Sequence, residues 1–143
     1  MEKHRKAYVT ILGRAPGQIA YELTVQHASG LHAEDWTPAV NVFGCGKQIV
    51  VCVELAGVKK ESIHIEAEPR RLLLRGYREA PEPDNCDGPL MKVLALEIDH
   101  GRFQREIALP VNVDPGSVKA EHRNGLLWIH LPFRNDGRSI QST

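Results

Sequence analysis

The feature that most constrains the fold is a succession of short apolar runs, each bounded by turn-forming residues, which begins at Trp36 and continues almost to the end of the chain. Runs of about four to eight residues that are rich in β-branched and aromatic side chains predict strands. Their close spacing is typical of an all-β sandwich or barrel, and we find no convincing helical pattern after Trp36. The sequence therefore predicts an all-β domain of about eight short strands.

Turn signals connect several of the expected strands. The first two apolar runs are separated by residues 44–47, and the last two by Asn124-Gly125, whose residue types accept the positive φ of a tight hairpin. Residues 62–66 alternate polar and apolar side chains, as a half-buried strand does. We expect strands over residues 40–43, 48–55, 62–66, 72–74, 91–96, 103–109, 118–122 and 126–131.

One long loop interrupts this pattern. Residues 80–89 contain three prolines and four Asp, Asn or Gly residues, a composition that excludes a regular element. Long loops in compact domains usually have a function. We divide the 143 residues into an N-terminal arm (1–35), one sandwich domain (36–134) and a C-terminal tail (135–143), because a second full domain would not fit.

Composition narrows the environment and the partners. The chain has 18 basic and 18 acidic residues, so it has no overall field that would attract nucleic acid or an anionic membrane. Its three cysteines, Cys45, Cys52 and Cys86, form no CxxC pair, and their odd number argues against a disulfide framework. No stretch approaches the roughly 20 apolar residues of a membrane-spanning helix. We expect a cytoplasmic protein without a nucleic-acid or membrane partner.

Nucleotide and metal sites are not predicted. Gly46-Lys47 lacks the earlier glycine and the following Ser or Thr of a phosphate-binding loop, because Asn41 and Gln48 stand at those positions. His27 and His32 are not spaced to share one helical face, and no histidine and cysteine pair has zinc spacing. We therefore expect no metal and no cofactor.

Catalytic residues are not predicted either. No serine lies in a GxSxG elbow, which argues against a serine nucleophile. Glu66 and Glu68 share one strand face, as on any solvated surface, and spacing alone does not exclude a glycosidase. However, no platform of aromatic side chains accompanies them. We expect that the protein is not an enzyme.

Five ordered motifs between residues 36 and 133 carry a family likeness. They resemble the alpha-crystallin domain of the small heat-shock proteins, the alpha-crystallin or Hsp20 family of chaperones. The last two are the most specific. The motifs are Trp36-Thr37-Pro38-Ala39-Val40-Asn41-Val42; Leu55-Ala56-Gly57-Val58 followed by Glu61 and Ile63; Leu72-x-Leu74-x-Gly76-x-Arg78; Gly101-x-Phe103-x-Arg105-x-x-x-Leu109-Pro110; and Ala120-x-x-x-Asn124-Gly125-x-Leu127-x-Ile129-x-Leu131-Pro132.

This resemblance implies an immunoglobulin-like β-sandwich of seven to nine strands and a homodimer. In the bacterial and plant branch of the family, the long loop carries a strand that pairs with the partner subunit. Residues 91–94 would form that strand and dock near residues 40–42 of the neighbour; the alternative is a loop that folds back onto its own subunit. Arg105 matches a family arginine near the dimer interface, with Glu97 or Asp99 as acidic partner; otherwise it is a solvated residue. The expected interface residues are Val40, Val42, Met91, Lys92, Val93, Leu94, Glu97 and Arg105.

The resemblance also implies a peptide groove. In the family, aliphatic peptide enters between two edge strands, which here contain Ile63 with Ile65 and Val118 with Ala120. Each aliphatic side chain buried there would contribute roughly 1.5 to 3 kcal/mol. The family tail usually carries an Ile-x-Ile motif for a neighbour's groove, whereas this tail has one anchor, Ile140. We therefore expect dimers or small oligomers.

Three positions depart from the family pattern. Ala56 replaces a proline, and Phe133 replaces a lysine. Trp128 stands where a polar residue is common, and it must point away from the core if Leu127 and Ile129 face it. There it would cover an interface, widen an apolar client patch or lie under the arm.

The implied function is that of a holdase, which binds partially unfolded client proteins without ATP and prevents their aggregation. Its affinity would be weak and multivalent. The alternative is an adaptor that resembles the CS or p23-type co-chaperone modules and binds one defined folded partner. That related group generally lacks the exchanged strand.

Overall fold

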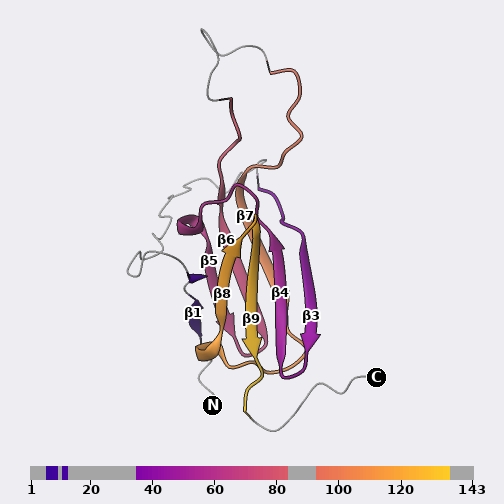
Figure 1. Ribbon diagram of the computed structural model, residues 1–143, viewed down its shortest axis with the longest axis vertical. Helices are drawn as coiled ribbons and strands as arrows, with labels where there is room; N and C mark the ends of the chain where they lie inside the picture. Colours follow the sequence, from indigo (N-terminus) through magenta and orange to yellow (C-terminus); the bar gives the residue numbers. More distant parts are fainter. Residues whose placement is uncertain (1–5, 10, 13–34, 84–92, 136–143) are drawn as a thin grey trace.

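The computed structural model describes residues 6–9, 11–12, 35–83 and 93–135, and these form two β-sheets packed face to face (Figure 1). Every strand pair is antiparallel except β2 with β8. The four-stranded sheet has the order β1 (Ala7–Val9), β5 (His64–Glu68), β6 (Arg71–Arg78) and β7 (Gly101–Ala108). The five-stranded sheet has the order β2 (Ile11–Leu12), β8 (Lys119–Arg123), β9 (Leu126–Pro132), β4 (Gln48–Glu54) and β3 (Val40–Cys45). The predicted β-sandwich is confirmed.

The core lies between the two sheets and follows the period of two that a strand imposes on its side chains. On β9, for example, Leu127, Ile129 and Leu131 are fully buried, whereas the residues between them are half-buried on the other face. Leu72 and Leu74 of β6 meet this set from the opposite sheet. Burial of alternate side chains from both sheets is the main favourable contribution to the stability of the fold.

Most expected strands are present with shifted ends. The strand expected over 62–66 begins later, because residues Lys60–Ser62 form a 3₁₀ turn, η1. The Ser62 hydroxyl lies 2.9 Å from the carbonyl oxygen of Lys59 and 3.0 Å from that of Tyr77, which holds this turn against the end of β6. A second 3₁₀ turn, η2 (Pro115–Ser117), precedes β8.

The strand expected over residues 91–96 is not formed within the single chain, and its pairing with a partner subunit stays a prediction. Residues 93–96 have no strand pairing within the single chain, and residues 91 and 92 lie outside the described residues. A strand is stable only when a neighbour satisfies its backbone groups, and among the described residues no strand does so here. Conversely, the sequence did not predict the strands β1 and β2 in the arm.

Two glycine positions explain why the family motifs are so restricted. Gly125 follows Asn124, and both have positive φ, as the hairpin signal predicts. Gly76 lies opposite Phe103 across β6 and β7, and a Cβ there would come within 2.5 Å of the Phe103 ring. The glycine of one motif therefore makes room for the aromatic residue of another.

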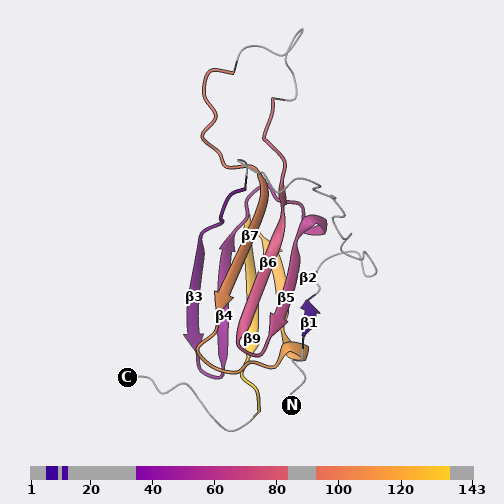
Figure 2. The same ribbon diagram turned by 180° about the vertical axis from the view of Figure 1, so that it is seen from behind.

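The two lateral sides of the sandwich differ in whether a further strand covers their edge strands. On one side, which we call the closed edge, strands β5 and β8 are each covered by a short strand from the arm (Figure 2). We call β1 and β2 together the strap. On the other side, the open edge, β3 and β7 have no further strand neighbour among the described residues, apart from a bridge between Trp36 and Phe103.

Candidate functional site

The described residues show no metal centre. In the part of the chain that the structure describes, no three His, Cys, Asp or Glu side chains come together in a way that could hold a metal ion. Within the same ranges, no helix is long and apolar enough to cross a membrane.

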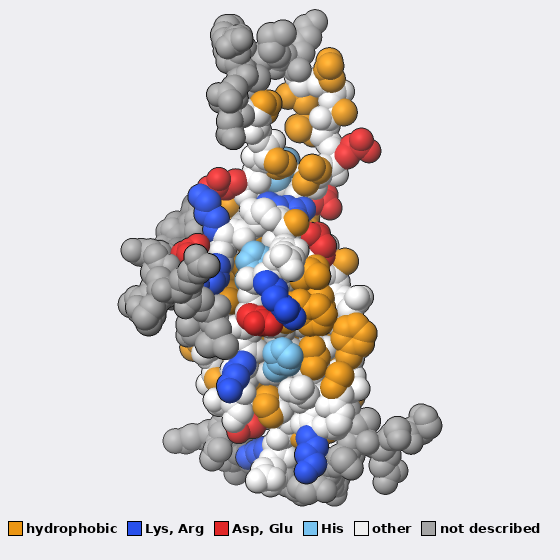
Figure 3. All heavy atoms as spheres, viewed as in Figure 1, with side chains coloured by type: hydrophobic (Ala, Val, Ile, Leu, Met, Phe, Trp, Pro, Cys, Tyr) orange, Lys and Arg blue, Asp and Glu red, His pale blue; other side chains and the backbone are white. Residues whose placement is uncertain are grey.

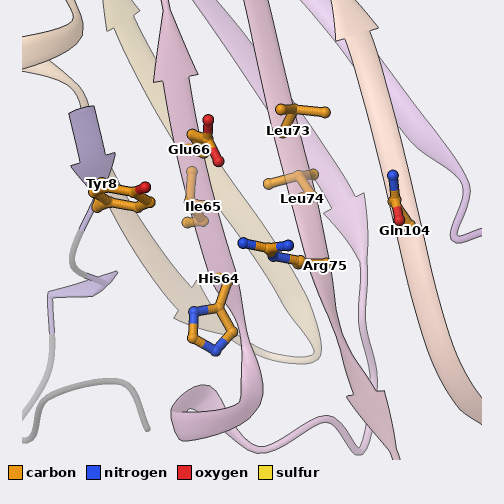
Figure 4. A pocket seen from close by; sticks show the side chains of 8 residues that line it. All are labelled: Tyr8, His64, Ile65, Glu66, Leu73, Leu74, Arg75 and Gln104. Atoms are coloured by element: carbon orange, nitrogen blue, oxygen red, sulfur yellow. The ribbon is translucent and has the colours of Figure 1, made fainter. Parts of the chain in front are cut away.

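A small depression lies on the outer face of the four-stranded sheet beside β1 (Figure 4). Its volume of about 50 Å³ is far below the roughly 300–1,000 Å³ of small-molecule sites. It is therefore too small to be the functional site of a ligand-binding protein. Its lining consists of Tyr8, His64, Ile65, Glu66, Leu73, Leu74, Arg75 and Gln104.

Strand β3 presents apolar side chains at the open edge. Val40 and Val42 lie opposite Val53 and Val51 of β4, so they point to the core side of the sheet. Val53 and Val51 are fully buried, but Val42 remains 46% exposed because the sheet edge extends beyond the cover of its neighbours. The structure thus brings the two predicted interface residues of β3 together on an edge strand, where another chain could add a strand.

The outer face of the same sheet carries a second apolar surface. It consists of Phe43, Val50, Cys52 and Trp128, which are cross-strand neighbours on β3, β4 and β9. Figure 3 shows apolar side chains gathered over β3 and β4, with charged side chains and histidine over β8 and β9. Trp128 points away from the core, as predicted, with the Arg123 guanidinium 5.8 Å from its ring centroid. Burial raises the pKa of the Cys52 thiol, which favours the unreactive protonated form.

The long loop carries exposed aliphatic side chains. Its described parts, residues 79–83 and 93–100, extend beyond the ends of the strands in both ribbon views (Figures 1 and 2). Met91 and Lys92 of the predicted exchanged strand lie outside the described residues. Four aliphatic residues in the second part are 61–92% exposed, which is unusual for side chains of this type. They are Val93, Leu94, Leu96 and Ile98.

The base of the loop is held by a buried arginine that the sequence analysis did not single out. Arg78 donates from Nε to the Asp99 carbonyl (2.7 Å) and from Nη1 to the Ala56 carbonyl (3.1 Å). Its guanidinium lies 3.9 Å from the ring centroid of Trp36, whose Nε1 donates to the Gly101 carbonyl at 3.0 Å. These contacts fix the two ends of the loop to each other and to the start of the domain. The alternation of Leu72-x-Leu74-x-Gly76-x-Arg78 places Arg78 on the inner face, and this signal could have identified it.

Arg105 occupies the inward face of β7 at the open edge. It lies opposite Leu74, between Phe103 and Ile107, and is half-buried. Among the described residues no carboxylate forms an ion pair with it, and Glu97 is exposed. The pairing of Arg105 with Glu97 or Asp99 is therefore not formed within one chain.

The closed edge contains all four predicted groove residues, and the strap pairs with two of them, Ile65 and Ala120. Ile63, Ile65 and Ala120 are almost fully buried, and Val118 is half-buried. Val9 of β1 lies opposite Ile65, and Ile11 of β2 lies opposite Ala120. The site expected to accept a peptide is thus filled by the chain's own arm.

A polar contact supports the strap on its outer side. Lys6 Nζ lies 2.6 Å from Glu66 Oε1, and this hydrogen-bonded ion pair raises the pKa of the Lys6 ammonium group. The Lys6 side chain is nearly half exposed, so solvent screens the pair. The predicted tail anchor, Ile140, lies outside the described residues.

Comparisons with known proteins give a consistent result. In sequence, 93 residues are 33% identical to 18 kDa antigen 1 of Mycobacterium avium, covering 65% of this chain and 59% of that protein. In a second comparison, 101 residues are 35% identical to a 17.8 kDa class I heat shock protein of Solanum lycopersicum, covering 68% of this chain and 58% of that protein. The matches thus span less than two thirds of these relatives' own length.

The comparison with solved structures and the comparison with family models agree with the sequence comparison. Heat shock protein 16.0 from Schizosaccharomyces pombe superimposes with a TM-score of 0.63 at 25% identity, over 76% of this chain and 96% of that one. The model of the Hsp20/alpha crystallin family matches residues 45–142, which is more than half of the chain. With the motifs, the sandwich and this match in agreement, the chain belongs to the Hsp20/alpha crystallin family.

Proposed function

We propose that this protein is an ATP-independent chaperone, a holdase that binds partially unfolded proteins and prevents their aggregation. Its family membership supports this, as do relatives named as heat shock proteins. The observation that carries the proposal is the exposure of loop aliphatics outside the proposed exchanged strand, which is 67% for Leu96 and 61% for Ile98. Exposed apolar groups of this density mark surfaces that bind other chains. Several weak contacts of this kind hold a client by multivalency rather than through one tight pocket.

We further propose that the protein forms a homodimer by exchanging the long loop. Among the described residues, no strand pairs with the edge of β3 that faces away from β4. Residues 91–94 of a second copy would satisfy the backbone donors and acceptors of that edge as an added strand. Either Val93 or Leu94 would then lie beside Val40 and Val42 on the inward face, because adjacent side chains of a strand point to opposite faces. The same exchange would bring Glu97 of the partner toward Arg105, which gives the half-buried guanidinium an acidic neighbour. With Ile140 as the one tail anchor, dimers or small oligomers are expected.

The assay for the holdase is light scattering from a heat-labile enzyme that aggregates on warming, with the full chain present and ATP absent. The expected result is suppressed scattering at equimolar or modest excess chaperone. Leu96→Asn combined with Ile98→Asn should weaken this protection, whereas Glu82→Gln, an exposed control in the same loop, should not. Unchanged aggregation at several-fold molar excess of the unmodified protein would refute the proposed function.

A further inference from the structure

We propose that the outer face of the five-stranded sheet is a self-association surface, on which a second copy of this chain docks face to face about a two-fold axis. The contact is made by the apolar set described above, which we call the flat patch: Phe43, Val50, Cys52 and Trp128. The flat patch lies on the opposite side of the sheet from Val42, beside which the exchanged strand would dock. The inference therefore goes beyond the proposed function and adds a second kind of contact between subunits.

The flat patch is closely packed although it lies on the face that points away from the core. Side chains on the outer face of a sheet usually face water, yet Val50 and Cys52 are each only 7% exposed. Their cross-strand neighbours are aromatic, with Phe43 beside Val50 and Trp128 beside Cys52. Figure 3 shows the apolar side chains gathered over β3 and β4. A flat apolar surface of this kind gains most when another flat surface removes it from water.

The order of residues in the flat patch matches itself after a half turn. Phe43 and Val50 form one cross-strand row, and Cys52 and Trp128 form the next row. Each row has one aromatic and one smaller residue, and the two aromatic residues lie at opposite ends of the patch. A two-fold axis in the contact plane would place Phe43 of each copy against Trp128 of the partner subunit. Interfaces between identical chains use such self-complementary patches, and offset or edge-to-face aromatic pairs strengthen them.

Charges beside the flat patch do not oppose this docking. Glu121 lies directly opposite Trp128 on β8, and its Oε1 is 3.1 Å from Arg123 Nε. Arg123 also contacts the Trp128 ring, so this border of the patch carries both signs of charge. On the other border Asn41, opposite Cys52, is uncharged. The whole chain has 18 basic and 18 acidic residues, so net charge does not keep two copies apart.

The size of the face limits the strength of the contact. The strands β3, β4, β8 and β9 have five to seven residues each. With strands about 4.8 Å apart and a rise of about 3.3 Å per residue, their outer face measures roughly 400 Å² per copy. Stable interfaces usually bury about 800 Å² per partner, so this contact is weak and reversible. Since apolar burial weakens on cooling, association should increase from the cold to physiological temperature.

The experiment is a mass measurement of the full chain by light scattering over a wide range of concentrations. The average mass should rise above that of the smallest species as concentration increases. Phe43→Asp and Trp128→Lys should each weaken this association by at least about tenfold, because each places a charge in the apolar contact. Gln104→Asp is the control, because it adds a charge at an exposed position on the outer face of the other sheet, and it should change nothing.

Mixing the two variants tests the two-fold arrangement itself. In a pair formed by one Phe43→Asp chain and one Trp128→Lys chain, the introduced carboxylate meets the introduced ammonium group at one contact. The other contact keeps Phe43 against Trp128 of the partner subunit. The mixture should therefore associate more strongly than either variant alone. A mixture that associates no better than its two components would overturn the proposal.

Other occupants of the flat patch would give different results. If both substitutions leave the mass unchanged at every concentration but weaken the suppression of aggregation, the patch binds clients and the proposal is refuted. If Trp128→Lys leaves the mass unchanged but increases protease cleavage within residues 13–34, the chain's own arm covers the patch, which also refutes it. Lost association with unchanged suppression of aggregation supports the proposal and separates it from the holdase.

Discussion

The two lateral edges of the sandwich have similar types of inward-facing residue, but one edge is covered by a further strand and the other is exposed. Each places valine, isoleucine or alanine on inward-facing positions of an edge strand. On the closed edge Ile65 and Ala120 are 1–2% exposed because the strap covers them, whereas Val42 on the open edge is 46% exposed. Residue type therefore does not decide which edge can bind another chain. What decides it is whether the chain supplies a strand to cover the edge, and the open edge is the side where a second chain has most to gain.

The largest expected effect comes from placing a charge at the closed edge. Ile65→Asp would put a carboxylate into a fully covered apolar position and should lower the free energy of unfolding by about 4 kcal/mol or more. The matched change at the open edge, Val42→Asp, should cost the single subunit less than about 1 kcal/mol, since that inward-facing side chain is already 46% exposed. Urea unfolding measures both, and equal losses would erase the difference between the edges.

The next effect concerns the loop that emerges beside the open edge. Arg78→Met keeps much of the volume but leaves the carbonyls of Asp99 and Ala56 without their donor, and it should destabilise the domain by about 2–3 kcal/mol. Amide exchange at Gly101 and Arg102 should rise with it. Arg78→Lys serves as the comparison, because it keeps the charge but not the fork of donors. An Arg78→Met protein with unchanged exchange would show that the loop base is held by other contacts.

A smaller effect separates the two faces of β3. Val42→Asp should weaken the dimer by about tenfold or more, because Val42 faces the proposed exchanged strand. Phe43→Asp is nearly as exposed but points to the outer face, so it should leave the dimer intact. Mass measurement across a dilution series distinguishes a 16.0 kDa chain from its dimer. If the two substitutions act alike, the exchanged strand does not dock along the inward side of β3.

The smallest expected effect is on thermal stability, and it comes from the ion pair between Lys6 and Glu66 beside the strap. Ion pairing with Glu66 raises the pKa of Lys6 above its ordinary 10.5, so its contribution is fully present below that value. The contribution is lost as the pH rises through the raised pKa. Lys6→Met should therefore lower the thermal midpoint slightly at pH 8, and the difference from the unmodified protein should vanish in strongly alkaline solution. A difference that persists there would assign it to packing instead of charge.

The sequence predicted the sandwich well because strands with one buried face impose a period of two. Residues such as Leu127, Ile129 and Leu131 reveal their burial through spacing alone. The same alternation contained Arg78, but a positive charge in an inward position is recognisable as a clamp only when the carbonyls around it are known. Those carbonyls come from segments distant in the sequence.

The sequence did not predict the strap, and the strand expected over residues 91–96 is not formed within one chain. The two differences have opposite reasons. The segments 7–9 and 11–12 are too short, and too close to Gly13 and Pro16, to indicate strands, yet each pairs with an edge of the sandwich. Residues 93–96 form an apolar run, which favoured a strand, but they lack a strand neighbour among the described residues of the same chain. Pairing partners, which are tertiary or quaternary, override local propensity in both cases.

The contacts of Arg78 and Trp36 at the base of the loop also make the intrinsic tryptophan fluorescence sensitive to the position of the loop. The chain has two tryptophans, and Trp36 is buried beneath the Arg78 guanidinium, whereas Trp128 is half-buried on the outer face of the sheet. A nearby fixed charge and burial shift indole emission differently from a partly hydrated position. In a Trp128→Phe protein the remaining fluorescence would therefore come from the point where both ends of the loop meet the domain. Movement of the loop on meeting another chain could then be followed as a colour change, with no label attached.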